Sequence, residues 1–75
     1  MTIDLTHVLV FKTNIGTQTE KQKITSLLAA HPHIEELSVD TEDVDCVLRV
    51  VSKHLHPEEI INLVKNGGFE CRELE

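Results

Sequence analysis

The order in which strand-like and helical patterns follow one another constrains this 75-residue chain most. Runs rich in β-branched residues predict four strands, and two segments with apolar residues three and four positions apart predict helices. The strands are expected over residues 6–13, 34–40, 44–51 and 69–74, and the helices over residues 18–30 and 57–66. The order β-α-β-β-α-β with short connections is typical of the split βαβ, or ferredoxin-like, fold.

Helix boundary signals support these assignments. Thr17-Gln-Thr-Glu20 matches a capping box, in which a hydroxyl and a carboxylate satisfy free N–H groups at a helix start. Pro32 cannot continue the first helix, and Pro57 suits the first turn of the second. Gly67-Gly68 ends that second helix, because glycine adopts left-handed backbone angles without steric cost.

We therefore expect a single α+β domain over residues 1–75, with its core within about 6–74. The predicted sheet is antiparallel with strand order 4-1-3-2, and both helices lie on one face. An apolar patch on the open face often marks an interface, so a homodimer or docking on a larger protein is a hypothesis. The residues expected on that face are Val47 and Val51, with either Val8 and Val10 or Leu9 and Phe11.

The charge balance excludes some classes of partner. Thirteen acidic and seven basic side chains give a net charge of −6, which argues against nucleic-acid binding and against a basic membrane anchor. Two cysteines are too few for a disulfide scaffold, and no signal peptide or membrane-spanning segment is visible. We expect a cytoplasmic domain without membrane insertion.

No pattern of catalytic residues is present. The serines Ser26, Ser38 and Ser52 fall in predicted helix or strand positions rather than in a nucleophile elbow. No glycine-rich phosphate loop follows a strand, and a chain of this length is too short for a sizeable pocket. The sequence therefore predicts a protein that is not an enzyme.

Four segments give the chain a family resemblance. They are Phe11-Lys-Thr-Asn-Ile15, His33-Ile-Glu-Glu-Leu-Ser-Val-Asp40, Pro57-Glu-Glu-Ile-Ile61 and Gly67-Gly-Phe-Glu70. Together with the element order, they make residues 6–74 resemble the heavy-metal-associated (HMA) domain family. That family comprises small copper chaperones and the metal-binding domains of copper-transporting ATPases. The resemblance implies the ferredoxin-like fold and a role in binding other proteins.

The resemblance also implies where a metal site would lie. In the HMA family two cysteines of a CxxC in the loop after the first strand hold Cu(I) through thiolates, which soft metals prefer. Alignment on Ile15 puts Thr17 and Glu20 at those positions. Because a hydroxyl and a carboxylate are hard ligands, we expect a binding or regulatory domain that has lost the soft-metal site. The alternative is a metal-trafficking protein with other ligands, namely the histidines or Cys71.

Five histidines are expected at the end of the fold opposite this loop. Four of them, His31, His33, His54 and His56, are candidate ligands for a weakly bound Zn, Ni or Cu(II) ion, since these metals accept imidazole. The fifth is His7. Alternatively, His31 and His56 serve the helix ends and the other histidines are solvated. No other cofactor is expected.

The two cysteines are predicted in strands separated by the first strand, too far apart for a disulfide. Cys46 and Cys71 are therefore expected to be core thiols, with an exposed, reactive Cys71 as the alternative.

An acidic segment connects the second and third predicted strands. It lacks the spacing of a calcium-binding loop, so a solvated turn is expected. Because it would lie at the same end as the loop after the first strand, it is a candidate surface for a basic protein partner. Its acidic residues are Asp40, Glu42, Asp43 and Asp45.

Overall fold

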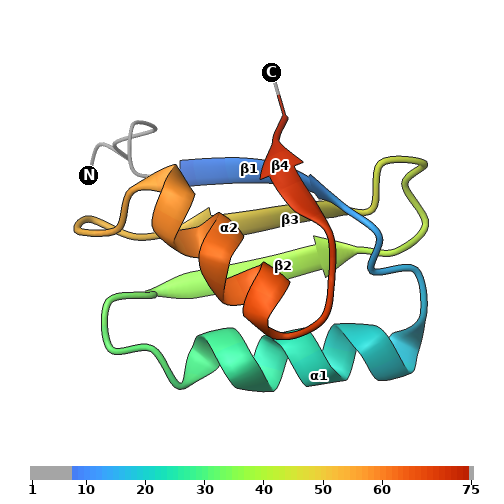
Figure 1. Cartoon of the computed structure of the whole chain (residues 1–75), viewed down its shortest axis with the longest axis horizontal. Coiled ribbons are helices and arrows are strands. Elements are labelled where there is room, and N and C mark those ends of the chain that lie inside the picture. The colour runs from blue at the N-terminus through green and yellow to red at the C-terminus, as the bar shows by residue number, and fades with distance from the viewer. Residues whose placement is uncertain (1–7, 75) are drawn as a thin grey trace, which may run out of the picture.

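Residues 8–74 are described by a computed structural model, in which two helices cover one face of a four-stranded sheet (Figure 1). The elements are β1 (Val8–Thr13), α1 (Gln18–Ala29), β2 (Glu36–Asp40), β3 (Val47–Val51), α2 (Pro57–Asn66) and β4 (Cys71–Glu73). Their order confirms the predicted βαββαβ pattern. None of the helices in this part of the chain is long and apolar enough to span a membrane.

The sheet has the predicted topology. Its strand order is β2-β3-β1-β4, and all three neighbouring pairs are antiparallel. In the register, Phe11 lies opposite Leu48, and Lys12 lies opposite Arg72. The ferredoxin-like fold expected from the sequence is thus the fold observed.

The core lies between the sheet and the helices. Alternation along the strands turns one set of side chains toward the helices, and the apolar stripe of each helix meets them. The fully buried side chains of this core are Phe11, Ile15, Ile24, Leu28, Leu48, Val50, Ile60 and Val64.

The face of the sheet without helices carries a mixed set of side chains. Phe11 points into the core, so Val8 and Val10 occupy the open face, which decides between the two alternatives for β1. Arg49 lies opposite Val10, and Val47 is only 8 % exposed. The apolar patch on this face is therefore smaller than the sequence suggests.

The predicted start of the third strand is wrong. Residues 44–51 alternate in polarity, but β3 begins only at Val47. Val44 belongs to the turn and is 93 % exposed, and Cys46 has a positive φ of 46°, which no strand residue adopts. The Cys46 N–H donates to the carbonyl of Asp43, so a tight turn replaces the first three residues of the expected strand.

Three other elements differ from their expected bounds by one or two residues at an end. Helix α1 ends at Ala29, β2 begins at Glu36 and β4 contains only residues 71–73. The expected beginning of the first strand, Thr6 and His7, lies outside the described residues.

Two glycines end α2 in different ways. The N–H of Gly67 donates to the carbonyls of Leu63 and Val64. Gly68 follows with φ of 93°, and no atom lies within 4 Å of where its β-carbon would be. Any loss of stability caused by a side chain at residue 68 therefore arises from the positive φ and not from a steric clash.

We expect Gly68→Ala to lower the free energy of unfolding by about 1 kcal/mol, because a left-handed backbone is unfavourable for alanine. Gly16→Ala is the matched control. Its β-carbon would have only an ordinary contact, 3.9 Å from Cys46 Sγ, so it should leave stability unchanged or slightly higher. Urea denaturation of both variants measures the difference. Equal midpoints would contradict this account of the turn.

Candidate functional site

Three connections meet at one end of the sheet, which we call the loop end. They are the β1–α1 loop (residues 14–17), the β2–β3 hairpin (residues 41–46) and the α2–β4 turn (residues 67–70) (Figure 1). The N–H of Thr13 donates to the carbonyl of Asp45 at 3.1 Å, and the N–H of Glu70 donates to Asn14 Oδ1 at 2.9 Å. Hydrogen bonds therefore connect all three segments.

A buried hydroxyl holds the centre of the loop end. Thr13 is 7 % exposed, and its Oγ1 donates to the carbonyl of Cys46 at 2.6 Å. The same oxygen accepts from the N–H of Ile15 at 3.1 Å. This side chain thus fixes both the start of the β1–α1 loop and the end of the hairpin.

The start of α1 confirms the predicted cap. Thr17 Oγ1 accepts from the Glu20 N–H at 3.1 Å, and Thr17 Oγ1 also donates to Glu20 Oε1 at 3.1 Å. The second half of the capping box is shifted by one residue, because Glu20 Oε1 accepts from the N–H of Gly16 instead of Thr17. The side chains of Thr17 and Glu20 thus accept hydrogen bonds from N–H groups at the helix start and are hydrogen-bonded to each other.

The thiol of Cys46 lies beside this loop, which the sequence analysis missed. Its Sγ is 3.9 Å from the position that a β-carbon on Gly16 would occupy, and the side chain is half-buried. The prediction of a core thiol in a strand is therefore wrong for Cys46. The sequence feature that indicates the turn is Asp43-Val-Asp45. The Asp43 carboxylate accepts a hydrogen bond from the Asp45 N–H at 2.8 Å, which forms a turn.

The acidic side chains of the hairpin have different local roles. Asp40 Oδ1 accepts from the N–H groups of Glu42 and Asp43, at 3.1 and 3.3 Å. Asp45 pairs with Lys12 at 3.3 Å. Glu42 is exposed, and no hydrogen bond or ion pair joins its carboxylate to another residue within 8–74. The structure brings the four acidic residues together in one turn, in which Asp40, Glu42 and Asp43 are exposed and Asp45 is paired with Lys12.

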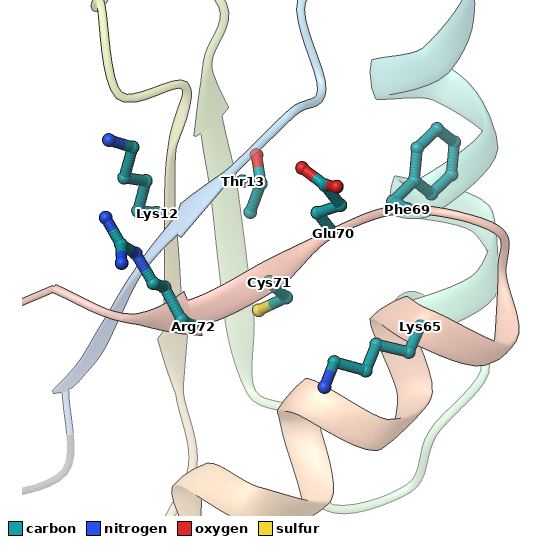
Figure 2. A pocket seen from close by; sticks show the side chains of 7 residues that line it. All are labelled: Lys12, Thr13, Lys65, Phe69, Glu70, Cys71 and Arg72. Atoms are coloured by element: carbon teal, nitrogen blue, oxygen red, sulfur yellow. The ribbon is translucent and has the colours of Figure 1, made fainter.

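A hollow of about 390 Å³ lies between β1, β4 and the end of α2 (Figure 2). Three basic side chains and one acidic side chain line it, so it carries excess positive charge in an acidic chain; they are Lys12, Lys65, Arg72 and Glu70. Cys71 lies at its wall and is buried, as the sequence predicts. Burial raises the pKa of the Cys71 thiol to about 11, and the charge of Lys65 opposes this increase. A buried, protonated thiol is a poor metal ligand and a poor nucleophile.

Histidines gather at the opposite end of the sheet, as the topology predicts. The ring centroids of His31 and His33 are 5.7 Å apart, and those of His33 and His54 are 5.0 Å apart. The backbone N–H of His56 donates to Glu59 Oε2 at 2.7 Å at the start of α2. His7 lies outside the described residues. Across residues 8–74, no three His, Cys, Asp or Glu side chains are arranged around a metal position.

Comparison with solved structures finds the same fold in several metal-binding proteins. The Cu(I)-loaded first domain of the human copper chaperone for SOD1 superposes with a TM-score of 0.79 and 18 % identity, over 88 % of this chain and 89 % of that chain. The yeast copper transporter domain Ccc2a superposes with a TM-score of 0.79 and 14 % identity, over 92 % of this chain and 96 % of that chain. The CsoZ metallochaperone superposes with a TM-score of 0.75 and 13 % identity, over 88 % of this chain and 96 % of that chain. The chain therefore has an HMA-like fold.

Comparisons of sequence alone give no relative. No protein-family profile matches the chain. No curated protein matches it either.

The raised pKa of Cys71 predicts how stability depends on pH. The unfolded chain loses the thiol proton near pH 9.0, whereas the folded protein keeps it to about pH 11. The free energy of unfolding should therefore fall between these two pH values. In Cys71→Ala this fall should be smaller, whereas Cys46→Ser should retain it. Urea denaturation at several pH values tests this, and the same slope in wild type and Cys71→Ala would contradict it.

Proposed function

We propose that this protein is a non-enzymatic binding or regulatory domain with an HMA-like fold that has lost the soft-metal site in the β1–α1 loop. The observation that carries the proposal is the reciprocal cap formed by Thr17 and Glu20. Both side chains occupy the aligned ligand positions, and both are already engaged. The loop keeps its shape through helix capping and not through metal coordination.

The donor atoms at this loop are unsuited to Cu(I). Soft metals select thiolate and thioether ligands, whereas Thr17 and Glu20 provide a hydroxyl and a carboxylate. Cys46 provides one thiol near Gly16, and the sequence contains no CxxC to supply a neighbouring pair. The β1–α1 loop thus has one thiol nearby, whereas the resembled family uses two thiolates at this loop.

Protein binding at the loop end is supported by charge. The Asp40 and Asp43 carboxylates hold the hairpin in a tight turn, and Glu42 projects from it into solvent. A rigid acidic turn accelerates encounter with a basic surface, because complementary potentials steer association. The human neighbour is described as a chaperone for another protein, which agrees with a docking role for this fold. We therefore propose a basic protein partner.

Restoring two thiols tests the metal part of the proposal. The double variant Thr17→Cys with Glu20→Cys should bind Cu(I) and shift the amide resonances of residues 16–20. The wild-type protein should show no shift there at equimolar Cu(I) under reducing conditions. The variant loses the cap, so its stability should fall by about 1 kcal/mol. Shifts in the wild-type loop would overturn the proposal.

A charge reversal tests the docking surface. A lysine-rich peptide, used as a probe at low salt, should shift the amide resonances of residues 40–46. Glu42→Lys should abolish these shifts without altering the turn, because no hydrogen bond or ion pair within residues 8–74 involves its carboxylate. Glu35→Lys carries the same charge change on an exposed residue at the other end and should retain them. Equal loss in both variants would show that only net charge matters.

A further inference from the structure

Two loops at the histidine end are joined through one buried hydroxyl. Ser52 is 3 % exposed, and its Oγ donates to the carbonyl of His33 at 2.6 Å. The same Oγ accepts from the N–H groups of His54 and Leu55, at 3.3 and 3.1 Å. A serine hydroxyl has one donor and two acceptor positions, so all three are used. The backbones of His33 and His54 are therefore held in a fixed relation.

The two imidazole rings lie at a separation that suits a shared metal ion. Their centroids are 5.0 Å apart and their planes are inclined at 63°. Two imidazoles bound tetrahedrally to one zinc ion, at Zn–N distances of about 2.1 Å, have centroids about 5 Å apart. The rings are in edge-to-face contact, and both side chains are exposed, so rotation about their side-chain bonds can turn a nitrogen of each toward a common ion.

His31 extends this pair but is less free to bind. Its centroid is 5.7 Å from that of His33, and its Nδ1 accepts from the backbone N–H of His33 at 3.1 Å. A neutral imidazole that binds metal through Nε2 carries its proton on Nδ1, so Nδ1 could no longer accept this bond. Coordination by His31 would therefore cost one hydrogen bond, and His31 is not counted among the ligands.

The surroundings favour transition metals over calcium or magnesium. Glu35 and Lys53 flank the pair in sequence, and their formal charges cancel. The donors offered are imidazole nitrogens, which suit Zn(II), Cu(II) and Ni(II), whereas Ca²⁺ and Mg²⁺ require oxygen ligands. Water would complete the coordination shell.

We propose that His33 and His54 form a two-histidine binding site for a divalent transition metal ion, with Ser52 as the positioning residue. This site lies at the end of the sheet opposite the β1–α1 loop. It is therefore independent of the docking function proposed for the loop end.

Zinc titration of the full chain tests the site, with calorimetry for affinity and NMR of the histidine rings for location. Equimolar Zn(II) should shift the rings of His33 and His54 most. His33→Ala and His54→Ala should each weaken binding by more than about tenfold. His56→Gln is the matched control, because it removes an exposed imidazole from the same loop and should bind like wild type. His31→Ala should have a smaller effect than either ligand variant.

Ser52→Ala separates a preorganised site from chance chelation by surface histidines. It keeps every imidazole but removes the contacts that join the two loops, so zinc affinity should fall about tenfold. The unfolding curve of Ser52→Ala shows whether the domain remains folded. Lys53→Ala, at the neighbouring position, is the control. Unshifted His33 and His54 rings at equimolar zinc would overturn the proposal. So would unchanged affinity in His33→Ala and His54→Ala, or in a folded Ser52→Ala.

Discussion

Two buried hydroxyls, one at each end of the sheet, determine how the loops of this domain are arranged. Thr13 joins the β1–α1 loop to the β2–β3 hairpin, and Ser52 joins the α1–β2 loop to the β3–α2 loop. They are the buried polar side chains of residues 8–74. Because a buried hydroxyl without partners is unfavourable, each stabilises the fold only when both of its loops are in place. Loop positions are therefore coupled to the packing of the core.

Hydrogen bonds within the chain also order the β1–α1 loop. In small metal-binding domains the metal itself can contribute to folding. Here Thr17 and Glu20 satisfy the free N–H groups at the start of α1, and Thr13 anchors the preceding residues. The β1–α1 loop is thus ordered by hydrogen bonds within the chain.

The sequence was sufficient to predict the element order, the strand order and the cap of α1. Each depends on local patterns, such as apolar periodicity or the spacing of Thr17 and Glu20. The start of β3 could not be predicted in this way, because Val44 and Cys46 continue the alternation while the backbone turns. In the sequence, Thr13 and Ser52 look like ordinary polar residues at or just beyond the end of a strand. Their partners lie 33 and 19 residues away, so their roles depend on tertiary contacts.

The two edges of the sheet differ in a way that bears on aggregation. Strand β4 has only three residues, so it offers a very short template to a strand from another molecule. Strand β2 is longer, but Glu36 and Asp40 stand at its two ends and are exposed. A second copy that extended the sheet by pairing with its own β2 would bring these carboxylates close together. The short length of β4 protects one edge of the sheet, and charge repulsion at β2 protects the other. Both edges therefore disfavour the addition of strands from other molecules.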